Sequence, residues 1–434
     1  MNSVLEIPRA VSSAAPALSD KSVAAPQKPK PQGGQNTPFQ RQRTPLKWMG
    51  GKYDDLPQIA AALPAAPVRA FIDPFVGGGS VAYNMEAMLK DRPERYVLSD
   101  ADSDLIRFMS LGDAEVQELL RLLGTVEAAR VAARKNTDLT RANFSHRFFQ
   151  NASKCILALS PALRNNSEVQ RIVLEERNRR EQAMLRIEKR ARLEKRKKSD
   201  LGLDAYARTG LLAAIYYIVR NVYNTTLASS SEASPKANSV ISTAMWFVLR
   251  ELSCGGVTRY SKQSRFNTPY GGGSYDGKSL VSKAPGIQSY ILDFLRDASV
   301  SVTEADVIDQ LNRVAPGPDD FLFLDPPYDQ NFSDDVGTTR RPFDPYKTTA
   351  RRERVSTHQD LFDWLLAEGH KTRWMLIERQ TPWIDEQIKR LKAGPDKKTI
   401  SVSFYDRRYS ANMKNRNVRE AVHVVVTNYK RTPG

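Results

Sequence analysis

The stretch FIDPFVGGGSV, residues 71–81, decides the expected fold. The apolar run over 69–75 predicts a strand, and Gly77, Gly78 and Gly79 follow it directly. Glycine permits a tight turn and a close approach of the backbone to a ligand. The residues over 80–90 then predict a helix. A strand, a glycine turn and a helix in this order are typical of a nucleoside-binding site in an α/β protein.

An acidic residue lies where such a site needs one. Asp100 ends a second predicted strand, over 95–100, 21 residues after Gly79. A carboxylate at this place can accept hydrogen bonds from a ribose diol. A nicotinamide cofactor follows the same logic, but its fingerprint is G-x-G-x-x-G, whereas these glycines are consecutive and follow Asp73 and Pro74. The pattern therefore predicts a nucleoside cofactor of another kind.

The stretch FLFLDPPYD, residues 321–329, carries the chemistry. Its apolar strand ends in Asp325, Pro326, Pro327 and Tyr328, and strand ends of a parallel sheet face the ligand crevice. The prolines fix their φ angles, so the Asp325 carboxylate and the Pro326 carbonyl are rigid acceptors.

Two rigid acceptors suit one reaction. They can grip the hydrogens of an aromatic amine, favour a pyramidal nitrogen and stabilise the positive charge that develops on attack at a methyl group. Tyr328 offers a flat face for stacking on a base, which must be flipped out of a duplex to reach the pocket. The alternative is that the two prolines only make a turn and that Tyr328 belongs to the core.

The order of elements, strands and helices on both sides of a long middle section, predicts an α/β sheet with an insertion. Further strands are expected over 374–378 and 421–429. The predicted parts are a disordered tail over 1–44, a catalytic domain over 45–114 and 301–434, and the insertion over 115–300. Within the insertion, helices are expected over 171–198, 203–222 and 243–252, with a loop over 225–239; another helix is expected over 103–123.

Charge points to the partner. The 434 residues carry a formal net charge of +16, which favours a polyanion such as nucleic acid. The segment 171–198 is densely basic, and either phosphate contacts or a solvated helix with intrahelical ion pairs explains it. No apolar run is long enough to cross a membrane. Cys155 and Cys254 alone make neither a disulfide framework nor a zinc site, so we expect no metal and a reducing, cytoplasmic compartment.

Taken together, these blocks resemble the Dam-type family of DNA adenine methyltransferases. The resemblance runs from about Pro45 to Tyr429, with insertions near 125–240 and 331–345. The matching blocks, in family order, are PLKWMGGK (45–52), FIDPFVGGGSV (71–81), LSDADSDLIRFM (98–109), RYSKQSRFNTPYG (259–271), DPPY (325–328) and a closing segment over 410–429.

The family implies an α/β fold, in which a Rossmann-like methyltransferase catalytic domain carries an inserted, mainly helical DNA-recognition domain. The family also implies an enzyme that transfers methyl from S-adenosylmethionine to the N6 amino group of adenine in double-stranded DNA, after base flipping. It implies cofactor contacts at Trp48, Lys52, Asp73, Phe75, Gly77, Gly79, Asp100 and Asp325, catalysis by Asp325, Pro326, Pro327 and Tyr328, and DNA contacts at Arg259, Arg265, Asn267 and Tyr270. The chain departs from the family pattern at Cys254 and Gly255, where an aromatic residue and an asparagine are usual, so recognition of GATC does not follow.

Two alternatives stay open on the sequence alone. One is an amino-group methyltransferase that acts on cytosine, RNA or a protein glutamine, although that motif usually begins with Ser or Asn instead of Asp. The other is a DNA-binding protein with an inactive methyltransferase fold, against which the intact Asp325 and glycine turn argue. A restriction–modification setting with a cognate nuclease is compatible with the family; the target sequence and the oligomeric state are left open.

Overall fold

The structure is a computed structural model that describes residues 39–48, 50–136, 138–194, 201–228, 235–256, 258–261, 263–327, 358–408 and 420–429. Several predictions lie wholly or partly outside these residues. They concern most of the tail over 1–44, residues 195–198 of the basic segment, part of the loop over 225–239, Tyr328, the insertion near 331–345, and the first part of the closing segment over 410–429.

The architecture is built on a seven-stranded sheet with the order β3-β2-β1-β4-β5-β7-β6. Its strands are β1 (Ala70–Asp73), β2 (Arg95–Asp100), β3 (Val300–Glu304), β4 (Phe321–Leu324), β5 (Arg373–Arg379), β6 (Ser401–Arg408) and β7 (Glu420–Thr427). All neighbouring pairs are parallel except the two made by β7. This mostly parallel sheet confirms the expected α/β class and fits a methyltransferase fold.

The five predicted strands are present, whereas β3 and β6 were not predicted. Both unpredicted strands lie at the edges of the sheet, where each pairs with one neighbour. Edge strands are covered less completely, so they lack the continuous apolar run that marks β4. The sequence VSVTE of β3 is partly exposed along its whole length, which explains why its pattern was missed.

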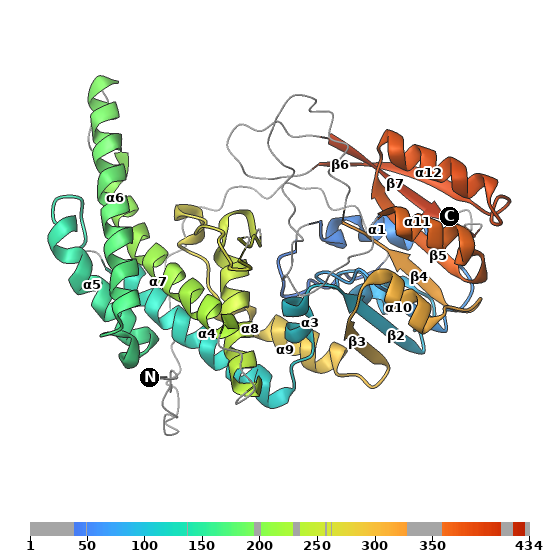
Figure 1. Ribbon diagram of the computed structural model, residues 1–434, viewed down its shortest axis with the longest axis horizontal. Helices are drawn as coiled ribbons and strands as arrows, with labels where there is room; N and C mark the ends of the chain where they lie inside the picture. Colours follow the sequence, from blue (N-terminus) through green and yellow to red (C-terminus); the bar gives the residue numbers. More distant parts are fainter. Residues whose placement is uncertain are drawn as a thin grey trace.

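Hydrophobic side chains from the two faces of the sheet form two core layers. Phe71 belongs to the first layer and Ile72 to the second, because successive side chains of a strand point to opposite faces. The second layer is covered by α10 (Val307–Val314), α11 (His358–Ala367) and α12 (Pro382–Ala393), as Figure 1 shows. Short helices α1 (Leu56–Ala60), α2 (Met85–Met88) and α3 (Ser103–Met109) complete this part of the molecule.

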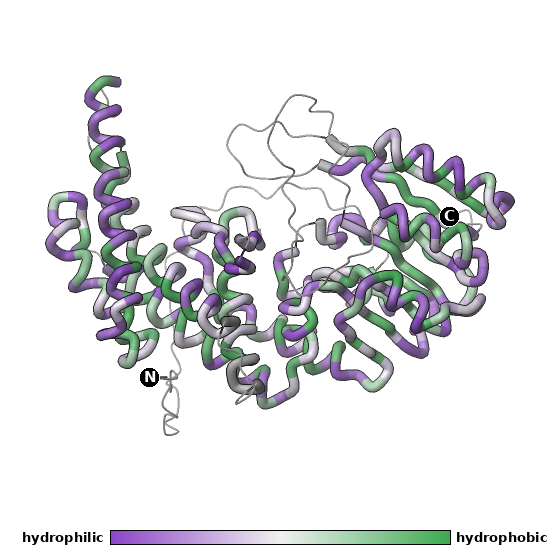
Figure 2. Tube along the Cα trace, in the orientation of Figure 1, coloured by the Kyte–Doolittle hydropathy of each residue, from purple (hydrophilic) through white to green (hydrophobic). Residues whose placement is uncertain are grey.

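A group of longer helices lies beside the sheet (Figure 1). They are α4 (Asp113–Arg134), α5 (Phe144–Leu159), α6 (Ser167–Leu193), α7 (Leu203–Ala228) and α8 (Pro235–Leu252), followed by α9 (Ala284–Gln288) and the π-helix η8 (Ser289–Leu295). Figure 1 shows α6 projecting beyond its neighbours, and Figure 2 shows that most of its residues are hydrophilic. Within the described part of the chain, no helix is both long and apolar enough to span a membrane.

Several predicted helix boundaries were wrong. The helix expected over 103–123 is two helices, α3 and α4, joined by a short connection that ends at Gly112. A new helix starts there because the Glu115 side chain caps α4 by accepting the Gly112 N–H at 2.9 Å. The basic helix starts earlier than expected, since the Asn166 side chain caps it by accepting the Val169 N–H at 3.0 Å. The loop expected over 225–239 contains the end of α7 and the beginning of α8.

Candidate active site

Three carboxylates meet at the carboxyl ends of neighbouring strands. Asp73 ends β1, Asp100 ends β2, and Asp325 directly follows β4. The strand order reverses between β1 and β4, and ligands of open α/β sheets bind in the crevice at such a point. The pKa of Asp73 is raised well above its usual range, first by burial and then by the charges of Asp325 and Asp100. The three acids are therefore within electrostatic reach of one another.

Asp100 is held by the glycine turn. Its Oδ2 accepts the Gly77 N–H at 3.0 Å and its Oδ1 accepts the Asp102 N–H at 2.9 Å. Burial raises the pKa of Asp100, and these backbone donors partly oppose that shift. A carboxylate oxygen can accept more than one hydrogen bond, so both oxygens keep capacity for a diol. The Gly77 and Asp102 N–H groups thus fix the orientation of the Asp100 carboxylate beside the glycine turn.

The glycines of the turn leave space that aromatic side chains of the protein itself occupy. Gly77 and Gly79 have positive φ angles of 49° and 74°. A Cβ atom on Gly77 would lie 2.7 Å from the Trp48 indole nitrogen, and one on Gly79 would lie 1.9 Å from the Tyr290 hydroxyl. No residue larger than glycine fits either position, because the backbone conformation and the neighbouring ring both exclude a side chain.

Trp48 and Phe75, both predicted cofactor contacts, lie beside the acids. The Arg250 guanidinium stacks on the Trp48 ring at 3.7 Å from the ring centroid, which fixes the indole over the turn. The Phe75 backbone N–H donates to Asp73 Oδ1 at 3.1 Å. Each residue therefore helps to set the geometry of the turn.

Lys52 forms an ion pair with Asp325. Its ammonium also donates to the Gly50 carbonyl at 3.2 Å, and the Lys52 side chain is only 3% exposed against 19% for Asp325. Burial raises the pKa of Asp325, while the charges of Lys52 and Arg407 oppose that shift. Lys52, predicted as a cofactor contact, thus favours the ionised form of Asp325. Pro326 is buried directly after Asp325, and Pro327 is half-buried.

Two residues of this cluster were not predicted. Asp55, at the end of the turn η1 (Lys52–Asp55), forms an ion pair with Arg407 of β6, and Arg407 also donates to the Gly51 carbonyl at 2.9 Å. Burial raises the pKa of Asp55 to about 6, and the charges of Arg407 and Lys52 oppose the rise. Asp55 could have been suspected from its place three residues after Lys52. Arg407 carried no comparable signal, because only the sheet brings it here.

The predicted DNA-binding residues lie on the connection that follows α8. Tyr260 and Phe266 form an antiparallel bridge, and we call residues 258–261 and 263–270 the Arg259 hairpin. The Arg259 side chain is exposed and its Nε donates to Asn267 Oδ1 at 2.7 Å; Arg265 is also exposed. Tyr270 differs from the others, since it is 7% exposed and its hydroxyl donates to Asp276 at 2.8 Å.

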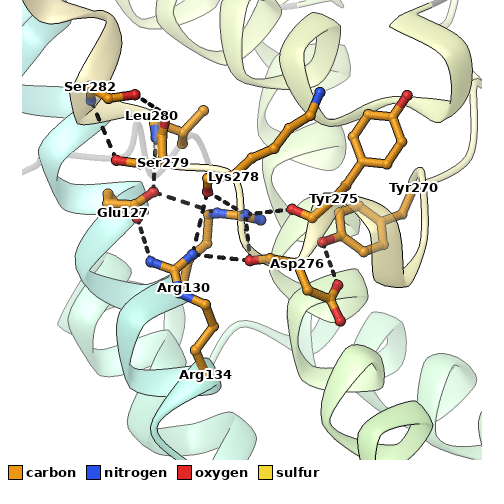
Figure 3. Close-up of polar contacts among 10 residues, drawn as sticks. All are labelled: Glu127, Arg130, Arg134, Tyr270, Tyr275, Asp276, Lys278, Ser279, Leu280 and Ser282. Carbon is orange, nitrogen blue, oxygen red and sulfur yellow. Dashed lines mark hydrogen bonds and ion pairs between the residues drawn. The ribbon is translucent and has the colours of Figure 1, made fainter. Parts of the chain in front are cut away.

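A buried polar network supports the residues that follow the hairpin (Figure 3). The Arg130 guanidinium is fully buried and donates to the carbonyls of Tyr275 at 3.1 Å and Lys278 at 3.0 Å. Glu127 forms an ion pair with Arg134 and accepts the Leu280 N–H at 3.1 Å. The side chains of helix α4 therefore fix the backbone path of residues 275–280.

The basic helix α6 neutralises much of its own charge. Its intrahelical ion pairs join Arg171 with Glu168 and Glu175, Arg177 with Glu181, Arg179 and Arg180 with Glu176, and Arg190 with Glu194. For residues 171–194, this pairing favours a solvated helix over a surface dedicated to phosphates.

Parts of the chain are similar to known proteins. Residues 48–172 match the family model described as D12 class N6 adenine-specific DNA methyltransferase. A DNA adenine methylase of Vibrio cholerae is 44% identical over 79 residues, which are 18% of this chain and 26% of that protein. The DNA adenine methylase of Escherichia coli K12 is 35% identical over 83 residues, 19% of this chain and 27% of that protein.

These matches confirm the predicted resemblance to the Dam-type family. The aligned part spans about a quarter of the length of these relatives. The family model covers Trp48, the glycine turn and Asp100, and it ends before the Arg259 hairpin and Asp325.

Proposed function

We propose that this protein is a site-specific DNA methyltransferase that transfers a methyl group from S-adenosylmethionine to the N6 amino group of adenine. The observation that carries the proposal is the meeting of Asp73, Asp100 and the Lys52-bound Asp325 at the switch point of the sheet. The family match over residues 48–172 supports the same reaction.

The acid-rich crevice fits S-adenosylmethionine, which carries a ribose diol, an ammonium group and a sulfonium. Burial and mutual repulsion raise the pKa of Asp73, so a cationic ligand is favourable beside it. Asp100, oriented by the Gly77 N–H, would accept from the ribose hydroxyls. Trp48, Phe75 and the glycine turn would bound the pocket, and Lys52 would act on Asp325. When bound, the cofactor supplies an electrophilic methyl group.

The catalytic role falls to the residues after β4. The Asp325 carboxylate, whose ionised form Lys52 favours, would accept a hydrogen bond from one N–H of the adenine amino group, and the Pro326 carbonyl would accept a hydrogen bond from the other N–H. Both acceptors are held by the strand end and by the prolines before the substrate arrives, so they stabilise the charge that develops on nitrogen. Tyr328 would stack on an adenine flipped out of the duplex.

The helical region over 115–300 is proposed as the DNA-recognition domain. Arg259 would read a base edge, because a guanidinium can donate two hydrogen bonds to guanine, and Asn267 would orient it. Arg265 would contact DNA from the same exposed hairpin. Tyr270 would support the hairpin through Asp276. A cognate nuclease would be a functional partner outside this chain.

The test is transfer of tritium from labelled S-adenosylmethionine to duplex DNA, RNA and protein, followed by sequencing of the methylated DNA. We expect label in DNA, on N6 of adenine and within one short sequence. Label on cytosine, RNA or protein would assign a different substrate. Binding of DNA without any transfer would make the protein an inactive member of the fold.

A further inference from the structure

A buried carboxylate links the two functional regions. Asp104 lies in α3 and is 2% exposed. Its Oδ2 accepts the hydroxyls of Tyr223 at 2.5 Å and Tyr260 at 3.0 Å, and its Oδ1 accepts from Arg107 at 2.8 Å. The two hydroxyls also lie 3.1 Å apart. A carboxylate with this many donors is locked in orientation, so the groups that it binds are locked with it.

One end of this link is the cofactor strand. Asp104 follows Asp100 by four residues. Between them, Asp102 is held by Asp100 through its backbone N–H and caps α3 by accepting the N–H groups of Asp104 and Leu105. The segment from the end of β2 to the start of α3 is therefore one hydrogen-bonded unit.

The other end is the Arg259 hairpin. Tyr260 is adjacent to Arg259, and the Phe266 ring packs edge-on against both Tyr223 and Tyr260. Asn224, next to Tyr223 on α7, accepts the Phe266 N–H at 2.8 Å and donates to the Phe266 carbonyl at 3.1 Å. The hairpin thus packs against α7 and is hydrogen-bonded to it, while the Tyr260 hydroxyl joins the hairpin directly to α3.

We propose that Asp104 is a positioning residue for target recognition, which holds the Arg259 hairpin in its base-reading position through the Tyr260 hydroxyl. This inference rests on the proposed function and adds a specificity determinant that itself touches neither cofactor nor DNA. Burial and the Asp104 charge raise the pKa of Tyr260, so its hydroxyl stays a donor. The Arg130 network of Figure 3 is a separate support, because it holds residues 275–280, which follow the hairpin. The Tyr260 end of the hairpin is held by Asp104 and not by that network.

The test variant is Tyr260→Phe, which removes only the hydroxyl. The control is Tyr206→Phe on the same helix as Tyr223, since the Tyr206 hydroxyl makes no hydrogen bond within the described residues. Fluorescence anisotropy would compare two duplexes, one with the methylated sequence that the labelling experiment identifies and one with that sequence scrambled. Calorimetry would measure S-adenosylmethionine affinity, and thermal unfolding would verify folding.

We expect Tyr260→Phe to lower the ratio of target to scrambled affinity by about tenfold, the loss typical of a hydrogen bond to a charged group. The KM for target DNA should rise at unchanged kcat, and cofactor affinity and scrambled-duplex affinity should match the control variant. An unchanged ratio, or an equal loss on both duplexes, would overturn the inference while leaving the methyltransferase intact. A wild-type protein that methylates no DNA would remove the proposed function and this inference together.

Discussion

The crevice at the strand ends and the Arg259 hairpin are built in opposite ways. The crevice gathers the buried acid Asp73 with the half-buried acids Asp100 and Asp325 at the ends of regular strands, and its cation Lys52 is almost fully covered. The hairpin exposes Arg259 and Arg265 on irregular backbone. The buried side chains of Tyr223 and Asn224, both on α7, support this backbone. The difference indicates that methyl transfer needs charged groups held in fixed positions and shielded from water. DNA recognition needs accessible charged groups on a loop that the protein supports.

The largest expected effect comes from removing the central acid of the crevice. Asp325→Ala should lower methyl transfer by at least about 100-fold, because a pre-organised acceptor acting on developing charge is lost. DNA affinity should stay nearly unchanged, since it arises mostly from phosphate contacts. Tritium transfer and anisotropy would measure the two effects, with Asp319→Ala, exposed at the other end of β4, as the control. A variant that keeps more than a few per cent of activity would remove Asp325 from the mechanism.

Asp100→Ala should weaken S-adenosylmethionine binding by roughly 10- to 150-fold, which corresponds to about 1.5–3 kcal/mol for charge-assisted hydrogen bonds. The choice of base should not change. Calorimetry gives the affinity, and Asp113→Ala at the start of α4 serves as a control outside the crevice. Equal affinities for the variant and the wild type would exclude Asp100 as the ribose acid.

Arg259→Ala tests the hairpin through a change in binding free energy, here for DNA. If Arg259 grips a guanine, the gap between target and non-target affinity should narrow by about 1–3 kcal/mol. Arg265→Ala, also exposed, provides the comparison within the hairpin. An equal loss on all duplexes would make Arg259 a backbone contact, and the base-reading residues would then lie elsewhere.

Lys52→Met should move the acidic limb of the kcat profile to higher pH. Ionised Asp325 is a stronger hydrogen-bond acceptor than the neutral acid. Burial raises the pKa of Asp325 and Lys52 opposes that rise, so loss of the ammonium raises the pKa further. Activity would then disappear at a higher pH on acidification. Lys52→Arg, which keeps the charge, should retain the original profile at saturating cofactor. An unmoved limb would show that Lys52 does not control Asp325.

The smallest effect is expected on α6. Replacing Arg171, Arg177 and Arg190 with Gln should change the log–log salt slope of DNA binding by less than about one, because their charges are already paired. The matched variant replaces Arg186, Lys189 and Arg192, which form no ion pair with a described carboxylate. A large loss of slope in the first variant would show that the ion pairs open and that α6 binds phosphates.

The sequence alone determined the fold class and most of the crevice. Apolar runs such as 321–324 predict strands buried on both faces, and the residues that end such strands must meet at one edge of a parallel sheet. Asp73, Asp100 and Asp325 could therefore be predicted together although they are far apart in the chain. Local signals of this kind are strong wherever a regular element fixes the direction of its last residue.

Other features depend on contacts that no local pattern contains. The glycines at 77 and 79 predicted a close approach, but the structure revealed Trp48 and Tyr290 as the neighbours. Arg407 reaches Asp55 only because the edge strand β6 returns to the sheet 352 residues later. Likewise, Asp104 meets Tyr260 only when α3 and the hairpin pack on α7. Burial and long-range pairing decide these contacts, because a side chain's partners are set by the packed elements around it and not by its neighbours in the chain.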